Sequence, residues 1–182
     1  MSTTTIPETN IDKQIEHSIL SLIRGIQDDP SKANAVFRAK SELTEGFRAH
    51  ISVRDFSFLS DEPKELGGTD LGANPVEYVL GAFAACQEIV IKAYATVLGI
   101  DVSSVKVEAE GNLDLHGFLN LNDERPGFNS VSFKTLIETS ETNSEKLKQL
   151  ELFSVNRCPV LDIIKNPVPL KGKIEFLNPR TT

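Results

Sequence analysis

The order of helix-like and strand-like stretches predicts an α+β fold, in which antiparallel sheets and helices are segregated along the chain. Two observations lead to this prediction. Residues 75–100 form the longest apolar stretch and have the length of a buried helix. The stretches before and after it alternate between apolar and polar residues, which is typical of strands joined by hairpins. The expected order is α-ββ-α-ββ-αα-β.

Length and composition limit the classes of protein that fit. The chain has 182 residues, of which 40% are hydrophobic and 25% charged, as expected for one globular domain with a sizeable core. Its net charge of −7 argues against nucleic acid as the main partner. The first residues resemble no secretory signal, and two cysteines do not suggest a disulfide framework. We therefore expect a cytoplasmic protein without a membrane span.

The N-terminal part divides into two expected pieces. Residues 1–9 are polar and Thr-rich, which predicts a disordered tail. Residues 10–29 form an amphipathic helix in this prediction, and residues 30–182 form a single domain. The helix has one apolar stripe at helical spacing: Ile11, Ile15, Ile19, Leu22, Ile23 and Ile26.

A hairpin and a helix follow in the first half of the domain. Residues 33–59 predict two strands that turn at Glu45-Gly46, and residues 60–74 are rich in glycine and predict a loop. Asn74, Pro75 and Glu77 are the N-cap, N1 and N3 residues of a capping box, so a helix should begin there. Gly99 should end this helix, because glycine is the usual residue after a helix C-terminus.

The second half continues with strands and then short helices. Residues 102–115 and 131–138 predict strands, with a loop at 116–128 between them. A helix should begin at 142 or 143 and bury Leu147 and Leu150, until the Arg157-Cys158-Pro159 sequence breaks it. Residues 160–165 predict a short helix. Residues 169–177 predict a last strand at a sheet edge.

Two cysteines are the most reactive groups in the sequence. Cys86 lies in the middle of the long helix, and Cys158 directly precedes a proline that can begin a short helix. A helix N-terminus and the neighbouring Arg157 should both favour the Cys158 thiolate. The scattered histidines and cysteines do not match the spacing of a metal site, and no cofactor is expected. On residue types alone, two inert buried thiols are the commoner arrangement.

Three segments of the sequence resemble the OsmC/Ohr family. They are GGTDLGANPVEYVLGAFAAC, RPGFNSV, and RCPVLDII followed by PVPLKGKIEF, and the similarity extends over residues 33–177. The resemblance implies an intertwined homodimer in which antiparallel sheets wrap around long central helices. It also implies thiol-dependent reduction of organic hydroperoxides. Cys86 would attack the peroxide, Cys158 would resolve the sulfenic acid as a disulfide, and an external dithiol would reduce it.

The sequence departs from the peroxidase members of this family at one position. In those members a glutamate directly follows the Asn-Pro pair, and this glutamate holds an activating arginine. In this chain Val76 occupies that position. Glu77 follows one residue later, about 100° around the helix and facing away from Cys86. Capping with Asn74 is the better supported role for Glu77, although it could serve the other subunit's site. Arg54 is the preferred activating cation and Arg125 the alternative.

The sequence therefore predicts a thiol peroxidase whose catalytic residues are Cys86, Cys158, Arg54 and Glu77. Its expected partners are a second copy, a small hydroperoxide and the dithiol, without nucleic acid or membrane. The substitution by Val76 leaves an alternative open, a non-catalytic small-molecule-binding or redox-sensing dimer of the same fold. A hot-dog thioesterase that uses Glu77 also has a long helix wrapped by sheet, but the Cys-Pro segment argues against it.

Overall fold

A computed structural model describes residues 8–177 of the chain. The helices are α1 (Glu8–Asp28), α2 (Pro75–Leu98), α3 (Leu115–Phe118), α4 (Ser144–Asn156) and α5 (Pro159–Lys165), with two short 3-10 turns, η1 (Pro30–Ala33) and η2 (Lys64–Leu66). The strands are β1 (Lys40–Glu45), β2 (Arg48–Val53), β3 (Phe56–Ser60), β4 (Val102–Leu113) and β5 (Phe128–Thr139).

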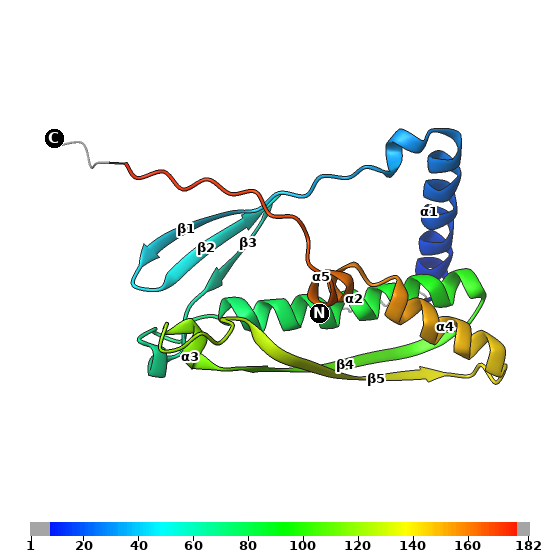
Figure 1. Ribbon diagram of the computed structural model, residues 1–182. Helices are drawn as coiled ribbons and strands as arrows, with labels where there is room; N and C mark the ends of the chain where they lie inside the picture. The colour runs from blue at the N-terminus through cyan, green and yellow to red at the C-terminus, as the bar shows by residue number, and fades with distance from the viewer. Residues whose placement is uncertain (1–7, 178–182) are drawn as a thin grey trace, which may run out of the picture.

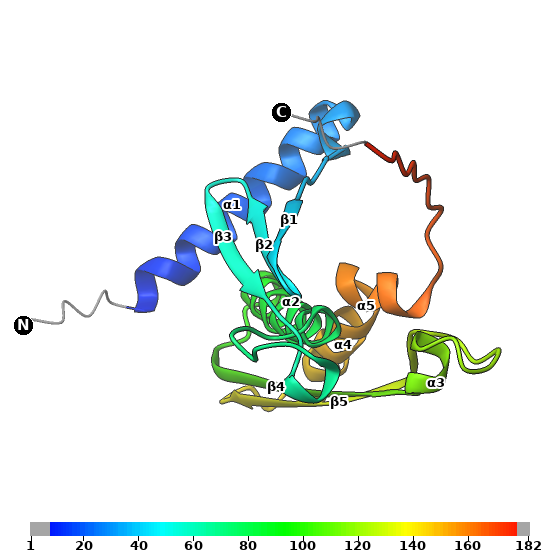
Figure 2. The same cartoon turned by 90° about the vertical axis from the view of Figure 1, so that its left-hand side faces the viewer.

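Helix α2 is the core element around which the other elements are arranged. The long β4–β5 ribbon runs along one side of it, and α4 and α5 pack beside it (Figures 1 and 2). Phe83, Ile91 and Ala95 on its buried face are fully inaccessible. By length and composition alone α2 could span a membrane, but in this fold it is the helix on which the core is built.

Two separate antiparallel sheets confirm the α+β prediction. Strands β1, β2 and β3 form one sheet in that order, and β4 pairs with β5 in the other, with Ala109 opposite Phe133. The sequence predicted only two strands before α2. The third, β3, was missed because the turn that precedes it is Arg54-Asp55, which lacks the glycine usual in such hairpins.

The loop before α2 is organised by the buried carboxylate of Asp61. This carboxylate accepts hydrogen bonds from the backbone N–H groups of Glu62, Thr69 and Leu71 at 2.9, 3.0 and 3.3 Å, and from the Thr69 hydroxyl at 2.5 Å. The Thr69 hydroxyl is the main cause that lowers the pKa of Asp61 to about 2, with the backbone donors adding to it. The loop therefore holds the start of α2 in a fixed place.

Two predictions at the ends of the chain need correction or fall outside the described residues. Residues 169–177 form no strand, because no segment within residues 8–177 pairs with them, and Phe176 is 95% exposed. In Figure 1 this red segment leaves α5 and runs away from the body of the molecule. At the other end, α1 begins at Glu8 rather than at Asn10, and residues 1–7 of the predicted tail lie outside the described part.

Candidate active site

Two cysteines from distant parts of the sequence lie close together, one on α2 and one at the start of α5. Cys86 lies in the middle of α2 and is half buried, whereas Cys158 is 2% exposed. Cys158 belongs to a buried cluster with Phe83 and Val90, and Cys86 packs against this cluster. The structure thus brings together the two thiols that the sequence predicted as a pair.

The start of α5 fixes the position of Cys158. Its sulfur caps the helix by accepting a hydrogen bond from the N–H of Leu161 at 3.4 Å, and Pro159 occupies the first helical position. The preceding helix α4 ends at Asn156, so only Arg157 and Cys158 separate the two helices. This tight connection leaves Cys158 little freedom to move away from α2.

The environment of Cys158 differs from the one that the sequence predicted. Burial raises the pKa of its thiol above the ordinary value, and the N–H of Leu161 offsets only part of this effect. A hydrogen bond with the Cys86 side chain and repulsion from a Cys86 thiolate raise the pKa further. The expectation that the helix terminus and Arg157 favour a Cys158 thiolate was therefore wrong, because desolvation is the larger effect.

Glu77 caps α2, as the sequence predicted. Its carboxylate accepts a hydrogen bond from the N–H of Asn74 at 2.8 Å, and its own N–H donates to the Asn74 side chain at 2.9 Å. Nine residues separate Glu77 from Cys86 on the helix, which places the two side chains on opposite sides. Within one chain, the structure does not bring Glu77 to the thiol pair.

Arg54 lies in the turn between β2 and β3. It adopts the left-handed conformation with φ of 56°, and its guanidinium lies 5.1 Å from the centre of the Phe56 ring. The side chain is exposed, and the turn stands away from α2 in both views (Figures 1 and 2). Its predicted activating role stays a prediction, because the contacts within one chain do not join it to Cys86.

A pocket of about 480 Å³ opens next to the cysteine pair. Leu161 and Ile164 of α5 form part of its wall and also pack against the cluster that holds Cys158 and Cys86. Val79 lines the pocket from α2, two helical turns before Cys86 and on the same side of the helix. Phe133 lines it from β5 and packs edge-to-face on Phe83 with ring centres 5.0 Å apart.

The sequence did not reveal which residues line this pocket. Its walls come from three segments that are far apart in the chain, α2, residues 125–133 and α5, and no periodic pattern links them. The one available signal was the RPGF segment, which supplied Arg125 as a candidate cation. Arg125 and Lys165 are the charged residues among those that line the pocket.

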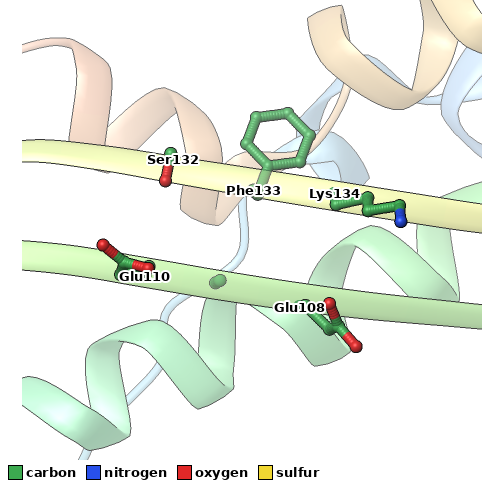
Figure 3. A pocket seen from close by; sticks show the side chains of 6 residues that line it. Glu108, Glu110, Ser132, Phe133 and Lys134 are labelled. Carbon is green, nitrogen blue, oxygen red and sulfur yellow. The ribbon is translucent and has the colours of Figure 1, made fainter.

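A second hollow lies on the β4–β5 ribbon and has different chemistry. Figure 3 shows its side chains coming from the two strands, with carboxylates and an ammonium group but no thiol or imidazole: Glu108, Glu110, Ser132, Phe133 and Lys134. Residues 8–177 also contain no group of three or more His, Cys, Asp or Glu side chains placed to hold a metal ion. The cysteine pair, with the neighbouring pocket that shares Leu161 and Ile164 with its cluster, is therefore the candidate site with nucleophilic groups.

A family model described as OsmC-like protein matches residues 68–173, which include both cysteines and the helix between the two sheets. The chain belongs to the OsmC-like family. No curated protein matches it. This OsmC-like chain is therefore placed by its family model and by its similarity to solved structures.

Several solved structures share the fold of this OsmC-like protein. The OsmC-like protein from Mycoplasma pneumoniae has a TM-score of 0.63 and 18% identity, over 74% of this chain and 90% of that one. An organic hydroperoxide resistance protein from Legionella pneumophila has a TM-score of 0.53 and 22% identity, over 72% and 90%. An organic hydroperoxide resistance protein from Elizabethkingia anophelis has a TM-score of 0.54 and 19% identity, over 74% of this chain and 91% of that one. These similarities show a common α+β fold with a long central helix.

Proposed function

We propose that this OsmC-like protein is a thiol peroxidase that reduces organic hydroperoxides. The observation that supports it best is the contact between half-buried Cys86 and buried Cys158, on α2 and at the start of α5. The two thiols come from segments 72 positions apart in the chain. Solved relatives with this fold include proteins named for organic hydroperoxide resistance.

The proposed reaction proceeds through two displacements at sulfur. The Cys86 thiolate attacks one peroxide oxygen, the S–O bond forms and the O–O bond breaks, and the alkoxide leaves as the alcohol after taking a proton. Cys158 then attacks the sulfur of the Cys86 sulfenic acid, the S–S bond forms, and water leaves. An external dithiol reduces this disulfide by thiol exchange and restores both thiols.

Each thiol has the surroundings that its proposed role needs. Cys86 is half buried, so a small peroxide can reach its sulfur. Cys158 is buried and its raised pKa keeps it protonated, so it does not compete for the peroxide. As a thiol it can also donate a hydrogen bond to the Cys86 sulfur.

Arg54 remains our proposed activating cation, supplied by the partner subunit. A cation near Cys86 would lower the free energy of the thiolate. Within one chain Arg54 is exposed on a turn that stands away from α2, which leaves its guanidinium free to reach a second copy. Glu77 keeps its capping role in this proposal, and its predicted catalytic role would also have to act across the interface.

A homodimer would account for the large apolar side chains that the single chain leaves exposed. Phe37 is 92% exposed before β1, and the segment after α5 has no strand partner. On α2, Ile89 and Val97 form an exposed apolar stripe near Cys86. Monomers rarely expose so many large apolar side chains. We propose that a second α2 packs on this stripe, in the cytoplasm where dithiol reductants are available.

The test is steady-state consumption of cumene hydroperoxide with a dithiol reductant. We expect turnover by the native protein, loss of turnover in Cys86→Ser, and native turnover in Ala85→Ser, which places the same hydroxyl on the exposed neighbouring position. A native protein no faster than Cys86→Ser would end the proposal.

The second candidate function is a dimer that binds an apolar molecule without turnover. The pocket of about 480 Å³ beside the cysteines favours it, because its size fits small-molecule sites. Native mass spectrometry of freshly purified protein distinguishes the two. A co-purifying ligand together with absent peroxidase turnover would support binding, whereas robust turnover would exclude it.

A further inference from the structure

The pocket beside the cysteine pair has an uneven distribution of charge. Apolar side chains form most of its wall, from Val79, Phe133, Leu161 and Ile164 among others. The charged residues that line it are Arg125 and Lys165, and both carry a positive charge. The pocket therefore combines a mostly apolar wall with two positive side chains, although the protein as a whole has a net charge of −7.

Arg125 lines the pocket as an exposed residue. Its guanidinium lies near Gly127, where a Cβ atom would be 3.5 Å from the Nη2 atom, an ordinary contact distance. The backbone that carries Arg125 is anchored by close packing on α3, since a Cβ at Gly117 would lie 2.5 Å from the carbonyl oxygens of Glu124 and Arg125. Only glycine fits there, so the loop is fixed in place.

Arg125 has no competing carboxylate. The ion pairs among residues 8–177 involve other residues, and the Arg125 guanidinium takes part in none of them. A guanidinium presents a planar pair of N–H donors that matches a carboxylate. Lys165 at the end of α5 adds a second positive charge on the same pocket.

We propose that Arg125 is a specificity-determining residue that selects hydroperoxides with an apolar body and a negatively charged head. The head pairs with Arg125, assisted by Lys165, and the apolar body lies along Val79 and Phe133 with its peroxide toward Cys86. This assignment rests on the proposed peroxidase function for its kinetic consequence, but not for binding itself. It gives Arg125 a role in substrate choice, distinct from activation of the thiol.

Binding is tested without any peroxide. Calorimetry compares decanoate with decanol, which has the same chain length and no charge, on native protein, Arg125→Gln and Arg24→Gln. Arg24 is an exposed arginine on α1 and serves as the matched control. We expect native protein to prefer decanoate at least about tenfold, and this preference to disappear in Arg125→Gln only. Equal affinity for both molecules in native protein would overturn the proposal.

Turnover provides the second measurement. The ratio of kcat/KM for a carboxylate-bearing hydroperoxide to that for cumene hydroperoxide should fall at least about tenfold in Arg125→Gln and recover partly in Arg125→Lys. If both substrates lose activity equally, Arg125 acts on the thiol and the specificity role is wrong. If decanoate binding depends on Arg125 but the native protein turns over neither peroxide, the binding site stands and the peroxidase proposal fails.

Discussion

Oxidation of the protein should form a disulfide between Cys86 and Cys158 within one chain and stabilise it strongly. The two cysteines are 72 positions apart, so the disulfide closes a long loop of the unfolded chain. For a loop of this length, the lost chain entropy corresponds to about 4 kcal/mol of stabilisation. For a chain of this size, that corresponds to a rise in Tm of roughly 10 °C.

The assay compares thermal unfolding of peroxide-treated and dithiol-reduced protein at one protein concentration, because a dimer's Tm depends on concentration. Strain in the closed disulfide would make the rise smaller than the entropy alone gives. Cys158→Ser should show no rise on oxidation. Equal Tm values for the oxidised and reduced native protein, or a disulfide that joins two chains on a non-reducing gel, would refute the pairing.

Three further predictions concern the parts that hold the site. Asn74→Ala and Glu77→Ala should each lower the free energy of unfolding by about 1 kcal/mol, as measured by thermal unfolding. Both variants should keep native peroxidase turnover below the melting range in steady-state assays, and a loss of turnover in Glu77→Ala alone would assign Glu77 a catalytic role. The folded-state pKa of Asp61 is lowered to about 2, so its contribution to stability should be present above the unfolded value of 3.8 and be lost as the pH falls toward 2. In acid unfolding experiments, Asp61→Asn should lack this loss of stability, and identical profiles for the native protein and the variant would contradict the prediction. Because the pKa of Cys158 is raised, iodoacetamide should begin to alkylate it in Cys86→Ser at a higher pH than it alkylates a free thiol, as measured by mass spectrometry. Alkylation at neutral pH as fast as that of a free thiol would show that the Cys158 thiol is not desolvated.

Much of the fold follows from local signals in the sequence. Helix α2 begins and ends where its capping box and Gly99 predict, because both signals act through neighbouring backbone groups. The predicted strands at 102–115 and 131–138 are found as β4 and β5. Strand β4 ends at Leu113, two residues before the predicted end, whereas β5 extends beyond its predicted bounds at both ends. The α+β class followed from the hairpins, which need only local turns and alternation.

Long-range effects account for what the sequence did not predict. The pKa of Cys158 depends on burial against Phe83 and Val90, and these residues lie on another helix. The segment 169–177 has the pattern of a strand but pairs with no other part of the chain that the structure describes, and pairing is not a local property. The cysteine pair was predicted by resemblance to a family, whereas the pocket with Arg125 required the packing of three distant segments.

The most direct test of the proposed chemistry is the mass of the protein after treatment with equimolar cumene hydroperoxide. The account predicts that native protein loses two hydrogen atoms as the Cys86–Cys158 disulfide forms, and that Cys158→Ser instead gains one oxygen atom on Cys86. Unmodified native protein, or oxygen retained on Cys86 while Cys158 stays a free thiol, would contradict it.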